Sequence, residues 1–138
     1  MSAEMAADLI AGGRLQLGIS RGSPEQVIDG YRYFGYNPPD GMTDADMARK
    51  HAEVFLQVLE GKGFAQPNPQ PMFPNPPGLL RLEPHSEGLR YRIWWGAATT
   101  ATAEWAAKIG VNLQSSTLVF DESGKPFHVQ QAEQIRAY

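Results

Sequence analysis

The sequence predicts an α/β fold with a parallel sheet, because strand-like apolar runs alternate with helical patterns along its 138 residues. The clearest example is Arg92–Gly110: the apolar run Ile93–Trp95 ends at Gly96, and a turn of small and hydroxyl residues follows. An alanine-rich helical pattern then runs to Gly110. A second strand–glycine–helix junction begins at Arg14. The length fits one compact unit, so we assign residues 1–138 to a single domain.

Helical spacing and turn residues predict the remaining elements. The best helix spans Thr43–Glu60, with Thr43 as its N-cap and two aspartates in its first turn. Its expected apolar face consists of Met47, His51, Val54, Phe55, Val58 and Leu59. Further helices are expected over residues 4–11, from Pro24 and over Phe127–Tyr138, the last with Val129, Ala132, Ile135 and Tyr138 at roughly helical spacing. Strands are expected at Arg14–Ser20 and Val111–Ser115, a short strand or an extended arm at Leu79–Glu83, and a turn at Asp121–Gly124.

A proline-rich stretch interrupts this alternation. Six prolines stand between Pro67 and Pro77, which excludes regular secondary structure there. Long loops of this kind are usually functional insertions, subunit contacts or linkers. We therefore predict a proline-rich insertion within the domain at residues 64–90.

Composition excludes several classes of function. The net charge is -3 with no basic stripe, which argues against a nucleic acid or an anionic membrane as partner. The chain has no cysteine, so disulfides, thiolate metal sites and a cysteine nucleophile are excluded. No apolar run reaches the length of a membrane span, and the start lacks the pattern of a signal peptide. These features predict a cytoplasmic protein that is not bound to a membrane.

The turn after Trp95 is the strongest candidate site. Thr99, Thr100 and Thr102 stand where the first backbone N–H groups of a helix lack partners, and such a terminus favours an anion. All three tryptophans lie between positions 94 and 105, so bulky apolar surface is expected around it. In the alternative interpretation, the small residues only allow tight packing and a threonine only caps the helix.

Arg21 follows the earlier strand, at the end where α/β proteins place their ligands. Its guanidinium could pair with a phosphate or an electron-rich ring, or it could be an ordinary surface arginine. The three histidines, His51, His85 and His128, have no metal-ligand spacing, so no metal is predicted. His85 is the only candidate general acid or base, and catalytic residues stay unassigned.

Taken together, GGRLQLGISRGS at Gly12–Ser23 and RIWWGAATTATAEWAAKIGVNLQSS at Arg92–Ser116 resemble the bacterial-luciferase-like family. That family contains flavin-dependent monooxygenases and related oxidoreductases built on a TIM barrel. The resemblance implies reduced FMN as cofactor, or the deazaflavin of some relatives, with O2 and a small apolar substrate. It implies that Thr99 and Thr102 bind the FMN phosphate with backbone N–H groups of Ala98–Thr100. It also implies that Arg21 reaches the flavin, with Ser23 beside it.

Such barrels typically need about 250 residues, so this chain is expected to form a partial (β/α)8 TIM barrel of three to four parallel strands. Two functions stay open: a flavin-dependent enzyme, or a non-catalytic truncated relative that keeps the fold elements or a phosphate pocket. A partial barrel exposes strand edges. We therefore expect a homo-oligomer in which a second copy completes the sheet, or the proline-rich segment folds across an edge.

Overall fold

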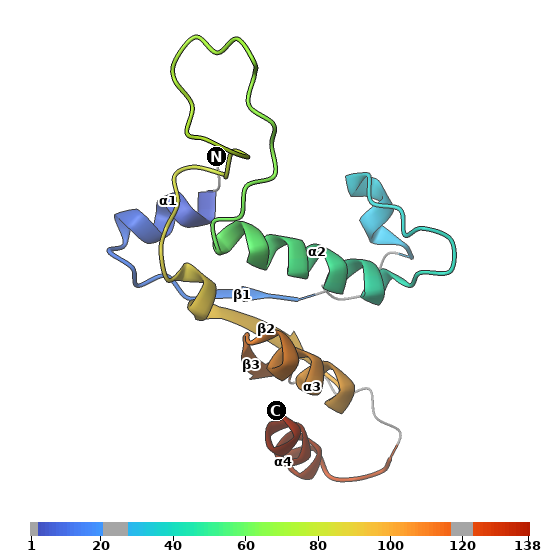
Figure 1. Cartoon of the computed structure of the whole chain (residues 1–138). Coiled ribbons are helices and arrows are strands. Elements are labelled where there is room, and N and C mark those ends of the chain that lie inside the picture. The colour runs from blue at the N-terminus through green and yellow to red at the C-terminus, as the bar shows by residue number, and fades with distance from the viewer. Residues whose placement is uncertain (1–2, 21–27, 117–122) are drawn as a thin grey trace.

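The computed structural model describes residues 3–20, 28–116 and 123–138 (Figure 1). The helix start at Pro24 and the first half of the turn at Asp121–Gly124 lie outside these ranges. The described helices are α1 (Ala3–Ile10), α2 (Asp44–Leu59), α3 (Thr100–Ile109) and α4 (Phe127–Ala137). The described strands are β1 (Leu17–Ile19), β2 (Ile93–Ala97) and β3 (Asn112–Ser115), and two 3-10 helices are η1 (Gly30–Phe34) and η2 (Leu89–Arg92).

The three strands form one parallel sheet in sequential order, with β2 in the centre. Leu17 pairs with Ile93 at the start of β1, and Ala97 pairs with Ser115 at the end of β3. The predicted α/β class with a parallel sheet is therefore confirmed. In the described part of the chain, β1 and β3 each have a single neighbouring strand, so both are edges.

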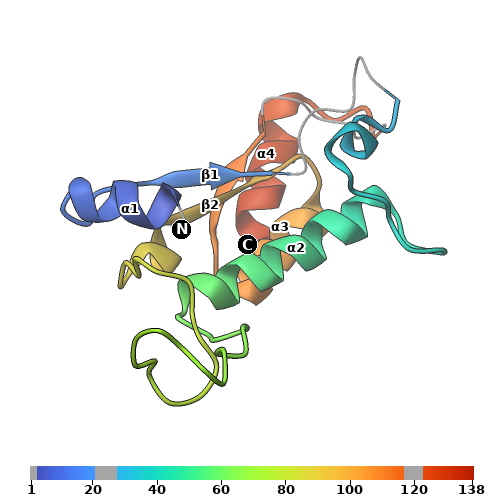
Figure 2. The same cartoon turned by 90° about the horizontal axis from the view of Figure 1, so that it is seen from above.

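Helices cover one face of this sheet. Along β2, Ile93, Trp95 and Ala97 are buried while Trp94 between them is exposed, as expected when alternate side chains point to opposite faces. The buried face packs against α2 and α3, which connect β1 to β2 and β2 to β3 (Figure 2). The core consists of Met5, Ala52, Leu56, Leu59, Leu89, Ile93, Trp95, Ala97, Ala103, Ala106 and Val111.

Helix α2 begins as predicted. The Thr43 hydroxyl accepts a hydrogen bond from the Asp46 amide at 3.1 Å, and the Asp46 carboxylate accepts one from the Thr43 amide at 3.2 Å. The predicted apolar face is partly wrong, because His51 and Val54 are exposed and Ala52 and Leu56 are buried instead.

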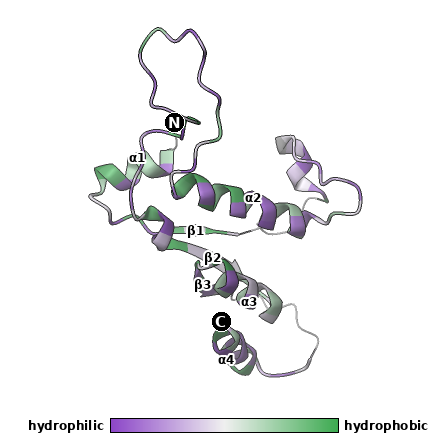
Figure 3. Cartoon of the chain, in the orientation of Figure 1, coloured by the Kyte–Doolittle hydropathy of each residue, from purple (hydrophilic) through white to green (hydrophobic). Residues whose placement is uncertain are grey.

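Helix α4 also turns a different face inward than predicted. Gln130 and Gln134 are buried, whereas Ile135 and Tyr138 are exposed. The prediction ranked positions by hydrophobicity, but these glutamines satisfy backbone carbonyls of adjoining loops. Figure 3 shows hydrophilic and hydrophobic residues mixed along α4 and α2, whereas α1 is mostly hydrophobic.

The proline-rich segment forms a projecting loop. Every residue between Leu59 and Leu89 is described, and the only β pairing there is an isolated antiparallel bridge between Ala65 and Leu80. Of the two forms predicted for Leu79–Glu83, a short strand or an extended arm, the strand is absent. Both views show the loop extending away from the sheet (Figures 1 and 2). It does not fold across a sheet edge, so that expectation is wrong.

Candidate functional site

The carboxyl ends of β1 and β2 lie side by side. Ile19 pairs with Trp95, and a Cβ built on Gly96 would lie 3.3 Å from the Cβ of Ser20. The small residues at this edge let the two chain segments approach closely. The structure therefore brings the two predicted strand–helix junctions together as far as Ser20. Arg21 and Ser23, the predicted flavin contacts of the first junction, lie outside the described residues.

The second junction forms the N-terminus of α3. Thr99 is the N-cap in an extended conformation, and its hydroxyl accepts a hydrogen bond from the Thr102 amide at 3.3 Å. The Thr99 and Thr102 hydroxyl oxygens lie 2.9 Å apart. Thr99 and Thr100 are exposed, while Ala98 and Thr102 are partly buried. The predicted site residues Ala98, Thr99, Thr100 and Thr102 are therefore neighbours at one exposed helix end.

Hydrogen-bond capacity remains at this helix end. The first N–H groups of a helix have no acceptor within it, and those of Thr100 and Ala101 have none elsewhere in the described residues. Each threonine hydroxyl carries one hydrogen, and the contact between Thr99 and Thr102 uses only one of the two. One hydroxyl hydrogen and two amide hydrogens can therefore be donated to a ligand.

The charge at this helix end differs from that at α2. The first turn of α3 contains no acidic residue. The first turn of α2 contains Asp44 and Asp46, and Asp46 occupies the helix end in a capping box with Thr43. A helix N-terminus carries positive partial charge. At α2 the chain supplies its own carboxylate to that charge, whereas at α3 it supplies only neutral hydroxyls.

Glutamines of α4 fix the turn between β2 and α3. The Gln134 side chain donates to the Ala98 carbonyl at 3.1 Å and accepts from the Ser115 hydroxyl at 3.2 Å. Gln131 donates to the Ser116 carbonyl at 3.3 Å. The ends of β2 and β3 are thereby tied to α4. The sequence analysis did not identify Gln131 and Gln134. Their only mark in the sequence is that two polar residues stand three positions apart in a predicted helix.

The tryptophans do not surround the site as expected. Trp95 is buried in the core, where its ring packs edge-on against Trp105 with centroids 4.8 Å apart. Arg49 of α2 lies over the Trp105 ring at 5.7 Å. Trp94 lies on the opposite face of the sheet and donates to the Gln16 side chain at 2.7 Å. The alternation of β2 separates neighbouring rings onto two faces, so the predicted apolar wall is wrong.

His85, the predicted general acid or base, lies away from the threonines. It neighbours Ser86, which bonds to α1 at the amino end of the sheet, so His85 lies at the end opposite Thr99. His51 is exposed and packs against the Tyr36 ring at 5.2 Å. His128 is exposed at the start of α4. His85 is therefore not placed to transfer a proton at the α3 terminus.

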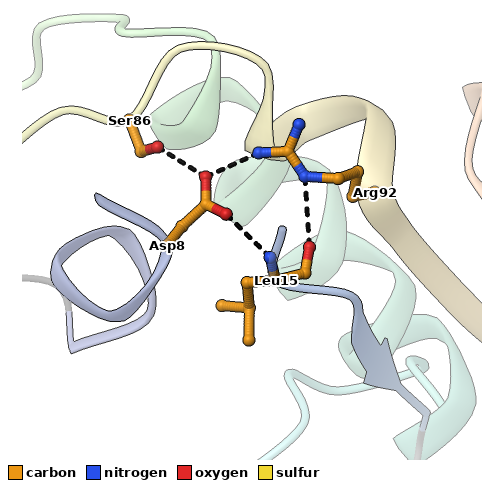
Figure 4. Close-up of polar contacts among 4 residues, drawn as sticks. All are labelled: Asp8, Leu15, Ser86 and Arg92. Atoms are coloured by element: carbon orange, nitrogen blue, oxygen red, sulfur yellow. Dashed lines mark hydrogen bonds and ion pairs between the residues drawn. The ribbon is translucent and has the colours of Figure 1, made fainter. Parts of the chain in front are cut away.

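A second polar cluster lies at the amino ends of β1 and β2 (Figure 4). The fully buried Asp8 carboxylate accepts bonds from the Ser86 hydroxyl at 2.6 Å, the Arg92 guanidinium at 2.6 Å and the Leu15 amide at 3.0 Å. Arg92 also donates to the Leu15 carbonyl at 3.1 Å. Burial raises the pKa of Asp8, but these hydrogen bonds and the charge of Arg92 outweigh it, so the pKa lies below its ordinary value. The cluster has a structural role: it joins α1, β1, η2 and the segment before it.

Because the pKa of Asp8 is lowered in the fold, the stability of the protein depends on pH in the acidic range. A carboxyl whose folded pKa is below its unfolded value stabilises the fold above the unfolded pKa, and this contribution is lost as pH falls through the folded pKa. We therefore expect the Tm to fall more steeply below about pH 4 in the wild type than in Asp8→Asn. Thermal melts followed by circular dichroism between neutral pH and pH 3 measure this. Parallel pH profiles of the two proteins would contradict the assignment.

Comparison of the sequence with protein-family models and with curated proteins found no match to either. In the described part of the chain, no helix is long and apolar enough to cross a membrane. Among those same residues, no three acidic or histidine side chains lie close enough together to hold a metal ion. The candidate site therefore depends on its own geometry and on the resemblance of its two junctions.

Proposed function

We propose that this chain binds FMN through its phosphate and forms the flavin-holding part of a luciferase-like monooxygenase or oxidoreductase. The observation that carries the proposal is the α3 terminus, with two free amides and a spare hydroxyl hydrogen beside the end of β1. In parallel α/β proteins, ligands bind at the carboxyl ends of the strands. The predicted flavin contacts Arg21 and Ser23 follow directly after Ser20 at that edge.

The topology supports a barrel rather than a doubly wound sheet. The strand order is sequential, and both crossover helices pack on the same face. A doubly wound sheet would carry helices on both faces, whereas in a (β/α)8 barrel they form one outer ring. We therefore propose that the uncovered face, with Gly18, Trp94 and Gln114, corresponds to the inside of a partial barrel.

The donors at the α3 terminus fit a phosphate. A phosphate monoester offers only acceptor oxygens and carries nearly two negative charges at neutral pH. Amides and hydroxyls donate to such oxygens, and no acidic side chain in the first turn opposes them. When bound, FMN would supply the redox chemistry, while Thr99, Thr102 and the Thr100 amide would hold its phosphate and orient the ring. Gln134 would keep the Ala98 turn in place.

The test is a comparison of FMN with riboflavin, which has the same ring but no phosphate. We expect the wild type to bind FMN more tightly, measured by quenching of flavin fluorescence on titration. The double variant Thr99→Val/Thr102→Val should lose roughly 1–3 kcal/mol of FMN binding, while its riboflavin binding stays unchanged. The amides remain in this variant, so its preference for FMN should be reduced rather than abolished. An unchanged preference for FMN in the double variant would place the phosphate elsewhere.

A matched control separates phosphate binding from helix capping. Thr43 caps α2 as Thr99 caps α3, so Thr43→Val should cost a similar ~1 kcal/mol of stability. The α2 terminus already holds its own carboxylate, so Thr43→Val should leave FMN affinity unchanged. Equal losses of FMN affinity in the Thr43 and Thr99 variants would indicate a general effect of stability.

A second candidate function is a non-catalytic relative that keeps the phosphate site. It is favoured by the contacts at the α3 terminus, which join hydroxyls, a glutamine amide and backbone groups and include no titratable side chain. FMN binding with no O2-dependent turnover of small apolar substrates would support this candidate. Turnover with reduced FMN would support the enzyme.

A further inference from the structure

Gly18 is the central residue of β1. Glycine weakens the interior of a strand, and it usually marks a bulge, a tight bend, or a place where a ligand or another backbone approaches closely. There is no bulge here, because Leu17–Ile19 pair in unbroken register with Ile93–Trp95. The φ angle of Gly18 is not positive, so its backbone conformation does not require glycine. Local backbone geometry therefore does not explain this residue.

The space beside Gly18 on the uncovered face of the sheet is open. Among the described residues, the only atom within 4 Å of a Cβ built on Gly18 is the side-chain oxygen Oε1 of Gln114, at 3.5 Å. That distance is an ordinary van der Waals contact, and no backbone approaches closely enough to exclude a side chain. Gly18 is also exposed. Of the usual reasons for a glycine within a strand, the approach of a ligand therefore remains.

Gln114 brings a hydrogen-bonding group to this open space. β3 is not a neighbour of β1 in the sheet, yet the Gln114 side chain reaches across β2 to Gly18. Gly96, the pairing partner of Gln114 in β2, has no side chain that would stand between them. The Gln114 side chain is exposed and makes no hydrogen bond within the described residues. Its amide therefore offers an acceptor oxygen and N–H donors to a ligand.

The open space is continuous with the proposed phosphate site. Thr99 follows Gly96 by three residues, which span at most about 11 Å. A ligand held by its phosphate at Thr99 can therefore pass over the carboxyl end of β2 to the uncovered face. The strand residues around the open space carry no charge, which suits a neutral ring: they are Gly18, Trp94, Gly96, Asn112 and Gln114.

We propose that the isoalloxazine ring of FMN lies flat over Gly18, with the Gln114 amide bonded to its edge. The pyrimidine edge of this ring has an N–H beside a carbonyl. A side-chain amide pairs with both, because its oxygen accepts from the N–H and its nitrogen donates to the carbonyl. This inference rests on the proposed flavin function and deepens it, by naming residues that hold the ring rather than the phosphate.

Gly18→Val tests the open space. Valine favours strands, and its Cβ meets only the flexible end of Gln114, so the Tm should be no lower than that of the wild type. The valine side chain fills the place of the ring, so the affinities for FMN and for riboflavin should both fall at least about tenfold. Quenching of flavin fluorescence on titration measures both affinities.

Gln16→Val is the matched control for this variant. It introduces the same side chain at an exposed position two residues earlier, toward the amino end of the sheet, and should leave both affinities unchanged. Unchanged flavin affinities in Gly18→Val overturn the proposal, and so do equal losses in Gly18→Val and Gln16→Val.

Gln114→Met tests the hydrogen bond to the ring edge. Gln114 is exposed, so this substitution keeps the fold. The probe is 3-methylriboflavin, in which a methyl group replaces the hydrogen of the ring N–H. The wild type should bind riboflavin about tenfold more tightly than 3-methylriboflavin, and Gln114→Met should reduce this preference several-fold. A preference that is the same in both proteins overturns the proposal.

The ring site and the phosphate site can fail separately. Gly18→Val and Gln114→Met should lower the affinities for FMN and riboflavin by the same factor, whereas Thr99→Val/Thr102→Val should lower that for FMN alone. A wild type that prefers FMN, but whose flavin affinities do not respond to Gly18→Val or Gln114→Met, would overturn the ring site and leave the phosphate site standing. A wild type that binds neither flavin would overturn both.

Discussion

Replacing Asp8 with alanine is expected to destabilise the fold by about 3–5 kcal/mol, the usual cost of breaking a buried ion pair. Asp8 is fully buried, and its carboxylate joins Ser86, Arg92 and the Leu15 amide. Without it, Arg92 loses its counter-charge and two further donors lose their acceptor. Urea unfolding followed by circular dichroism measures the loss. A change below about 1 kcal/mol would show that the cluster is dispensable.

Arg92→Met is the informative partner of this variant. It keeps much of the aliphatic stem but leaves the Asp8 carboxylate buried without its counter-charge. Protonation relieves such a carboxylate, so the stability difference from wild type should shrink as pH falls. In Asp8→Ala the uncompensated group is the Arg92 cation, which stays charged. The stability difference between this variant and the wild type should therefore shrink only at the lower pH where Asp8 of the wild type becomes protonated. Different pH profiles for the two variants would confirm that the ion pair, rather than packing, holds this end of the sheet.

Trp95→Ala is expected to cost about 3–5 kcal/mol, as large-to-small changes of buried aromatic residues do. Trp95 is 4% exposed and packs edge-on against Trp105 between β2 and α3. Its neighbour Trp94 is the matched control, because it has the same side chain on the uncovered face and one hydrogen bond to Gln16. Trp94→Ala should cost about 1 kcal/mol. Equal losses in the two variants, measured by urea unfolding, would contradict the assignment of the sheet's faces.

The sequence predicted those elements whose signals are local. Helix α2 follows from its capping threonine and first-turn aspartates, and β2 and α3 follow from an apolar run, a glycine and a threonine cap. The sequence indicated only that a threonine caps α3, and the bond from the Thr102 amide identifies it as Thr99. Capping and turn preferences act within a few residues, so they can be recognised before the fold is known.

The features that the sequence could not predict depend on contacts between residues far apart in the chain or on the burial of polar side chains. The bonds of Asp8 to Ser86 and Arg92 join residues that share no local pattern. Gln134 is buried because loop carbonyls require a donor, whereas hydrophobic spacing favoured Ile135 as the inward residue. Trp94 and Trp95 point to opposite faces of the sheet because side chains alternate along a strand. Their neighbouring positions in the sequence suggested a shared location instead. Phosphate binding at Thr99 stays a prediction.

The cluster around Asp8 has a consequence for how the chain folds during synthesis. Asp8 and Leu15 find their partners in Arg92, 84 and 77 residues later, and Gln16 bonds to Trp94 after a separation of 78. The first strand therefore has no pairing strand, and Asp8 has no counter-charge, until β2 and Arg92 have been translated. Contacts of such long separation are slow to close. Of the buried residues that share the core with Met5, only those in α2 and Leu89 are present before that point.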